Sequence, residues 1–228
     1  MVDAVDLVKG DIQRDFERAL KKIKKPADTI AGAQDYAQAV GDALVEAFRK
    51  NIGEDILVDG FLTPDLAEAL IKDPMIAGWR FVTSKTADIQ TAINNQAGYS
   101  IRALLAKTDE RRVDGMVTLA SEKPFAEVST KFYQATPNVM RAAVDKTVEQ
   151  NFINMAKAGV PVEVVRIPEG KCCDWCDGMA KAGPYKYADV HETGNDVWGR
   201  HLDCKCIIET HFGKMRSQTA FRRRPRSD

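Results

Sequence analysis

The five cysteines of this 228-residue chain are confined to two short segments near the C-terminus. Residues 171–176 read Lys-Cys-Cys-Asp-Trp-Cys, and residues 201–206 read His-Leu-Asp-Cys-Lys-Cys. Thiolates and imidazoles in a C-x-x-C and an H-x-x-C-x-C pattern are typical ligands of a tetrahedral zinc site. The spacing therefore predicts that two loops meet around one site, which is a metal centre, a pair of disulfides or a cluster of free thiols.

The spacing of the cysteines favours a metal ion. Cys173 and Cys176 are separated as in a zinc knuckle, where a tight turn directs two thiolates to one ion. Cys204 and Cys206, if they lie on a strand, point to the same face because side chains alternate. Cys172 is then a spare thiol. The preferred ligands of a structural zinc ion are Cys173, Cys176, His201 and Cys204, with Cys206 as a substitute for His201.

The composition describes a balanced chain that is expected to fold in a cytoplasm. Basic and acidic residues number 33 each, so no global attraction to nucleic acid is implied. Apolar runs are too short to span a membrane, and residues 1–6 lack the features of a signal peptide. Since disulfides are disfavoured in a cytoplasm, this compartment favours metal or reduced thiols and leaves disulfides as an open alternative.

Enzymatic interpretations of the same residues fit less well. Zinc nucleobase deaminases need H-x-E before P-C-x-x-C, whereas here the C-x-x-C comes first. A thioredoxin-like C-x-x-C would need a βαβ context, which the neighbouring pattern lacks. Cys176 and His201 could form a nucleophilic pair, but a cluster this dense produces such pairs by chance. We therefore expect no catalytic residue and no enzymatic activity.

The first two thirds of the chain are predicted to be helical. Apolar residues recur every three or four positions over residues 5–23, ahead of Pro26, and again over residues 30–48 after a cap at Asp28. A short strand is expected at residues 56–58, and Thr63-Pro64 predicts a helix to about Lys72. These stripes are expected to build an intramolecular bundle.

Three further helices are predicted before the cysteines. One carries an apolar stripe over residues 89–105, and a second spans Asp109 to Ser121 ahead of Pro124. Thr136-Pro137 predicts the start of a third, which continues to Ala158 and ends at Gly159.

The character of the chain changes after Gly159. Val162–Ile167 is rich in β-branched residues and predicts a strand, as does Cys206–Thr210. The fold class is therefore α+β and mostly α-helical. Three parts are expected: a helical region over residues 1–135, a cysteine-bearing domain over residues 136–212, and a basic, flexible tail over residues 213–228.

Residues 144–209 resemble the minor head proteins of tailed bacteriophages, the Mu protein F-like or head-morphogenesis family. The resemblance rests on residues 147–151 (Thr-Val-Glu-Gln-Asn), residues 158–160 (Ala-Gly-Val), the strand at residues 162–167 and the two cysteine segments, in that order. Leu202 replaces the proline usual after the histidine, Lys205 replaces an arginine, and Cys172 is additional.

The resemblance implies a structural role in the head of a phage particle. Such proteins act with the portal and capsid proteins in head assembly and in DNA packaging or delivery, and they would be found in the virion head after assembly in the host cytoplasm. The arginines of the tail would then be able to contact packaged DNA. Two alternatives stay open: a zinc-bearing DNA-binding module that uses the tail, and a thiol- or metal-dependent hydrolase.

Overall fold

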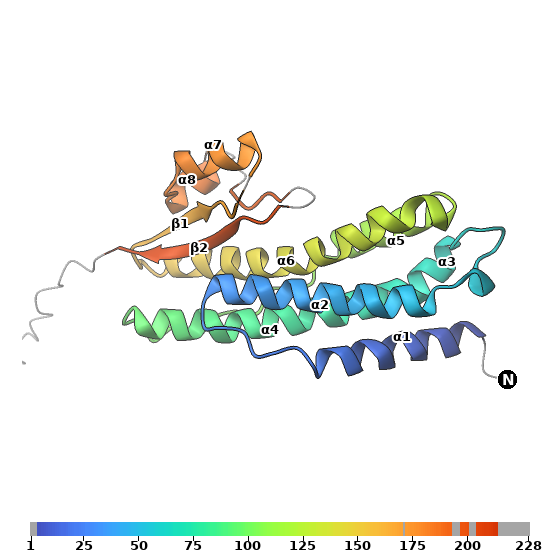
Figure 1. The fold of residues 1–228 in the computed structure, drawn as a ribbon. Coiled ribbons are helices and arrows are strands. Elements are labelled where there is room, and N and C mark those ends of the chain that lie inside the picture. The colour runs from blue at the N-terminus through green and yellow to red at the C-terminus, as the bar shows by residue number, and fades with distance from the viewer. Residues whose placement is uncertain (1–3, 171, 193–196, 201–203, 214–228) are drawn as a thin grey trace, which may run out of the picture.

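A computed structural model describes residues 4–170, 172–192, 197–200 and 204–213 (Figure 1). It confirms an α+β fold that is mostly helical, with one two-stranded antiparallel sheet near the C-terminus. Among the described helices, none combines the length and the apolar character needed to cross a membrane. The helices are α1 (Ala4–Leu20), α2 (Ile30–Asn51), α3 (Pro64–Ala67), α4 (Asp73–Gln96), α5 (Glu110–Ser121), α6 (Phe125–Lys157), α7 (Asp174–Ala182) and α8 (Tyr187–Glu192), and the strands are β1 (Val162–Ile167) and β2 (Ile207–Phe212).

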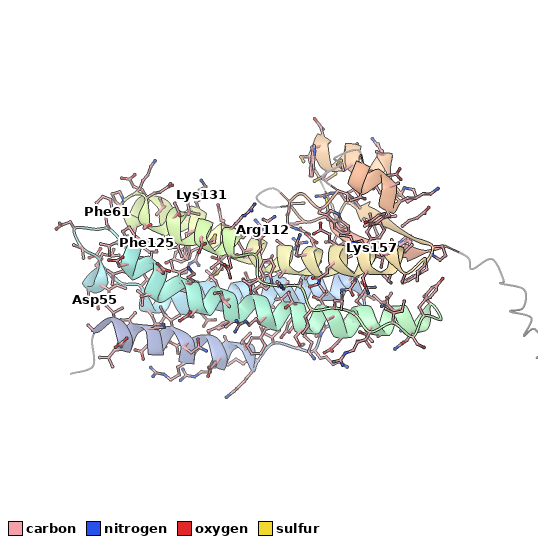
Figure 2. All side chains as sticks on the ribbon, turned by 180° about the vertical axis from the view of Figure 1, so that it is seen from behind. Asp55, Phe61, Arg112, Phe125, Lys131 and Lys157 are labelled. Atoms are coloured by element: carbon pink, nitrogen blue, oxygen red, sulfur yellow. The ribbon has the colours of Figure 1, made fainter. Side chains whose placement is uncertain are left out.

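The long helices α1, α2, α4 and α6 lie side by side, and the sheet rests on α6 with α7 and α8 on its outer side (Figure 1). Helix α6 packs against both α2 and α4 and also contacts both strands. Figure 2 shows Phe125 and Lys157 at opposite ends of α6, so that this one helix runs from the far end of the bundle to the cysteine-bearing region. It therefore connects the bundle core to the candidate site.

The bundle is held together by a large apolar core. Phe16, Phe48, Trp79 and Phe132 are completely buried, and the rings of Phe48 and Phe132 lie 5.5 Å apart. Helix α2 is capped by Thr29, whose hydroxyl accepts a hydrogen bond from the Gly32 N–H, and not by Asp28 as predicted. Burial of aromatic and aliphatic side chains at this scale dominates the stability of a domain.

The predicted helix start at Thr136-Pro137 is wrong, because α6 runs through Pro137 without interruption. The hydroxyl of Thr136 donates to the carbonyl of Phe132, one helical turn earlier. On α2, Gly41 faces the proline: a Cβ atom there would lie 2.4 Å from the Pro137 Cα. The close approach of α2 favours a helical Pro137, which outweighs the local signal for a helix start.

The helix predicted over residues 89–105 ends early, since α4 stops at Gln96 and Gly98 adopts a positive φ of 86°. Residues 99–109 instead form an irregular segment that is hydrogen-bonded to α4 and α6. The Asn151 side chain accepts from the Leu104 N–H at 2.7 Å and donates to the Leu104 carbonyl at 2.9 Å. Buried amides therefore replace helical hydrogen bonds here, and Leu105 of the predicted stripe is exposed.

The remaining predicted elements are close to those observed, except for the strand predicted at residues 56–58. Helix α5 begins after its cap Asp109 and ends at Ser121, and Gly159 follows α6 with a positive φ of 78°. The strand predicted at Val162–Ile167 coincides with β1. The strand predicted at Cys206–Thr210 is displaced to Ile207–Phe212. Instead of a strand at residues 56–58, a 3-10 turn (Glu54–Ile56) precedes an isolated bridge between Val58 and Phe61.

Candidate metal centre

Three thiols from two chain segments meet beneath α7. The sulfur atoms of Cys176, Cys204 and Cys206 all lie within 4.8 Å of one another, and Sγ of Cys176 is 3.8 Å from Sγ of Cys204. The three residues are 1–2% exposed. None of the five cysteines forms a disulfide in the structure, so the disulfide alternative is not observed. Three buried sulfurs at this separation could hold a metal ion.

The C-x-x-C motif acts as the start of α7. Cys173 is the N-cap residue, and its Sγ accepts a hydrogen bond from the Cys176 N–H at 3.5 Å. This turn places Cys176 in the first turn of α7, facing the sheet, while Cys173 is exposed at the edge of the cluster. Cys172 is half-buried and packs against the same thiols. The motif therefore places Cys176 in the thiol cluster, while Cys173 lies outside the three sulfurs that are within 4.8 Å of one another.

Cys204 and Cys206 immediately precede β2. They do not belong to the strand itself, although both thiols reach the cluster as predicted. Strand β2 pairs with β1 in antiparallel register, from Val162 opposite Phe212 to Ile167 opposite Ile207. His201, the predicted fourth ligand, lies outside the described residues. Of the predicted ligands, the structure thus brings three buried thiols together with Cys173 at their edge.

Arg166 lies directly against the thiols, and the sequence analysis missed it. Its Nη2 donates to Sγ of Cys204 at 3.2 Å and to Sγ of Cys176 at 3.5 Å. Its Nη1 donates to the carbonyls of Val197 at 2.7 Å and Gly199 at 2.9 Å. The sequence pattern could have indicated Arg166, because residues 162, 164 and 166 alternate onto the buried face of β1 and one of them is charged.

A second group of polar side chains fixes the Cys204–Cys206 segment to the bundle. Arg141 of α6 donates to the carbonyls of Cys204 at 3.0 Å and Lys205 at 3.1 Å. Arg200 donates to the carbonyls of Cys204 at 2.6 Å and Cys206 at 3.0 Å. Two guanidinium groups therefore hold the backbone that carries two of the thiols.

Asp145 and Gln34 complete this arginine network. The Asp145 carboxylate accepts from Arg200 at 2.7 and 3.0 Å, and its side chain is 4% exposed. Gln34 of α2 donates to Asp145 at 2.7 Å and accepts from Arg141 at 3.0 Å. The four side chains of this network connect α2 and α6 to the cysteine segment, which no local sequence pattern could have revealed.

The environment shifts the pKa values of the thiols in different directions. Burial raises the pKa of Cys176 to about 12, which favours its neutral form. At Cys173, the hydrogen bond from the Cys176 N–H lowers the pKa. Burial opposes ionisation of Cys204, but the Cys206 N–H together with Arg200 and Arg166 outweighs it and lowers the pKa. The pKa is thus lowered at Cys173 and Cys204 and raised at Cys176, which lies between them in the sequence.

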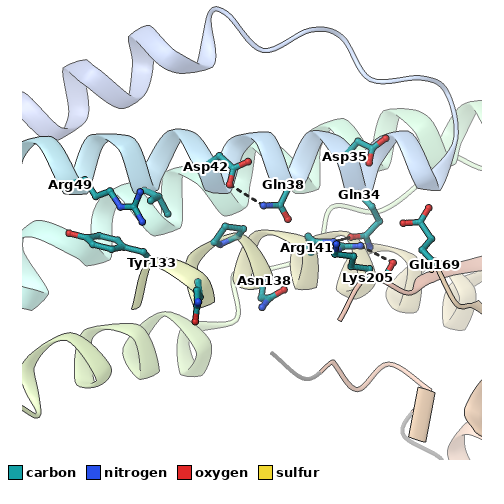
Figure 3. A pocket seen from close by; sticks show the side chains of 13 residues that line it. Gln34, Asp35, Gln38, Asp42, Arg49, Tyr133, Asn138, Arg141, Glu169 and Lys205 are labelled. Carbon is teal, nitrogen blue, oxygen red and sulfur yellow. Dashed lines mark hydrogen bonds between the residues drawn. The ribbon is translucent and has the colours of Figure 1, made fainter. Parts of the chain in front are cut away.

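An open groove of about 560 Å³ lies beside the arginine network, between α2 and α6 (Figure 3). Arg141 and Lys205 line it at the end near the cysteine region, and Arg49 stacks on Tyr133 at the other end, 4.7 Å from the ring centroid. None of the side chains that line this groove is a cysteine. The groove and the thiol cluster are therefore separate features.

Comparison with protein families identifies a family for the chain. The family model described as VG15 protein matches residues 80–224, which covers more than half of the chain. That range contains both cysteine segments, α5, α6 and both strands. No curated protein and no solved structure matches the chain. The chain therefore belongs to the VG15 protein family, a family of phage gene products.

Proposed function

We propose that this phage protein is a structural minor head protein, which acts with the portal and capsid proteins in head assembly and in DNA packaging or delivery. Its membership of a phage family and its resemblance to Mu protein F-like proteins support this role. In the particle it would belong to the head, and during assembly to the host cytoplasm. The role requires no catalysis.

The observation that carries the proposal is the attachment of the cysteine segment to the bundle. Arg141 and Arg200 together donate four hydrogen bonds to backbone carbonyls of residues 204–206. Thiols held so rigidly, at 1–2% exposure, suit a structural cross-link better than a nucleophile that must meet a substrate. We infer that zinc is the bound ion and that it stabilises a sheet too small to be stable alone.

Quantitative mass spectrometry of purified, DNA-filled heads tests the role. We expect a few copies of the chain per head, in a fixed ratio to the portal protein. Absence from heads would refute the proposal. In that case, salt-dependent DNA binding by the purified chain would favour the DNA-binding alternative. The arginines of the tail that this alternative would use, at positions 222–224 and 226, lie outside the described residues.

A further inference from the structure

The cysteine cluster is surrounded by more buried positive charge than buried negative charge. Arg166 and Arg141 are 3% and 7% exposed, and the side chain of Arg200 is 2% exposed. Among the described residues, Asp145 is the one carboxylate buried with them. Within the described part of the chain, three buried cations against one buried anion leave an excess of two positive charges. A buried charge without compensation is strongly destabilising, so this region needs an anionic partner.

The cysteines are placed to supply that negative charge. Arg166 donates to two thiol sulfurs and to two backbone carbonyls, and no described carboxylate pairs with it. Carbonyls and neutral thiols accept hydrogen bonds but carry no net charge. Thiolates do carry charge, and they are the form in which cysteine binds a metal ion.

The size of the charge excess distinguishes two ligand sets. A divalent ion bound by four thiolates carries two negative charges in total, which balances the two excess positive charges. Three thiolates with one neutral imidazole carry a single negative charge and would leave one buried cation uncompensated. The buried charges therefore favour a ligand set made entirely of sulfur over the set with His201 that the sequence spacing favours.

We propose that the cluster is a four-thiolate site for a divalent zinc-like ion, in which Cys173 joins Cys176, Cys204 and Cys206, and Arg166 is its charge-balancing positioning residue. The inference deepens the metal-binding part of the proposed function and rests on it. Cys173 is suitable because its Sγ already lies 3.5 Å from the Cys176 backbone nitrogen, at the edge of the three buried thiols.

X-ray absorption spectroscopy of the zinc-loaded full chain tests the ligand set. We expect four sulfur ligands at about 2.3 Å, an unchanged spectrum in His201→Ala, and the loss of one sulfur in Cys173→Ser. Cys172→Ser is the matched control and should keep all four. One nitrogen ligand at about 2.0–2.1 Å that disappears in His201→Ala would overturn the proposal. A chain that binds no zinc would refute the metal centre itself. The proposed role in the phage head is tested separately, by the number of copies per head.

Zinc affinity, measured by competition with a chromophoric chelator, tests the role of Arg166. We expect Arg166→Met to weaken zinc binding by about 10- to 100-fold, as is typical when a partner of metal ligands is removed. Arg166→Lys keeps the positive charge but loses the planar guanidinium with its several N–H donors, so the zinc affinity of this variant should be intermediate. Arg80→Met, at an exposed position on α4, is the control and should bind zinc normally.

The same variants separate positioning from folding. Circular dichroism at saturating zinc should show Arg166→Lys folded like the wild type, and its zinc affinity then decides the matter even if Arg166→Met does not fold. Wild-type affinity in Arg166→Lys together with wild-type affinity in Arg166→Met would refute the role of Arg166. Equal losses in both variants would also refute charge balance, because Lys restores the positive charge.

Discussion

The helical bundle and the cysteine-bearing region are stabilised in different ways. In the bundle, aromatic side chains such as Phe48, Trp79 and Phe132 are completely buried in a continuous apolar core. The cysteine-bearing region has a single two-stranded sheet, a small apolar cluster around Phe152, and a centre of thiols. A sheet of two strands buries too little to be stable alone. Here polar contacts to α6 and the thiol cluster substitute for apolar area.

The largest expected effect comes from the bundle core. Phe132→Ala should lower the free energy of unfolding by about 3–5 kcal/mol, because it removes a buried ring and leaves a cavity. The loss should be equal with and without zinc, since Phe132 packs against Phe48 and Phe125, in the bundle core. Urea unfolding followed by far-ultraviolet circular dichroism measures it. The control Phe81→Ala, at a ring that is 47% exposed, should change stability by less than about 0.5 kcal/mol. A loss that depended on zinc would show that the two regions are not independent.

An intermediate effect is expected where the two regions meet. Asp145→Asn keeps the shape of the side chain but removes the charge that pairs with Arg200, at a cost of about 1.5–3 kcal/mol. Hydrogen exchange should show lost protection in β2 while α2 keeps its protection. Asp42 is an exposed carboxylate on α2 that accepts a hydrogen bond from Gln38. The control Asp42→Asn should leave the protection of both α2 and β2 unchanged. Equal loss across α2 and β2 would contradict a separable cysteine-bearing region.

The smallest effect is expected at the outer side of the cysteine-bearing region. The Arg166 guanidinium lies 4.8 Å from the ring centroid of Trp175, which is 44% exposed. Trp175→Ala should therefore cost only about 0.5–1 kcal/mol, the usual value of an exposed cation–π contact. Differential scanning calorimetry of the zinc-loaded chain measures it. A loss as large as that of Phe132→Ala would mean that Trp175 belongs to a core, and the contrast between the two regions would fail.

Most secondary structure could be predicted because it depends on local patterns. The apolar periodicity of α1 and α2 and the β-branched run of β1 correspond to the observed elements. The errors fall where distant residues intervene. Pro137 is accommodated inside α6 beside Gly41 of α2, and the segment at Leu104 is held by Asn151, 47 residues away. The division into parts at residues 135 and 212 stays a prediction.

The candidate site also has features that follow from local sequence and features that depend on distant residues. The two cysteine segments could be predicted to meet, and Cys176, Cys204 and Cys206 do lie together. That Cys173 joins them as a ligand stays a prediction. The groups that hold this site could not be predicted, since Arg141 reaches Cys204 across 63 residues and Gln34 reaches Asp145 across 111. Arg166 is the exception, because its place on the buried face of β1 follows from alternation.

The sequence by itself determined the helical character, the first strand and the meeting of two cysteine segments, since each depends on residues close together in the chain. Only the tertiary structure decided how the cysteine-bearing region is attached. Arg141 and Asp145 lie on α6, Arg166 lies on β1 and Arg200 precedes the second cysteine segment. Their charges act together because burial removes the water that would screen them. Charge balance within a buried cluster is a property of the folded chain, and it is this balance that points to four thiolates.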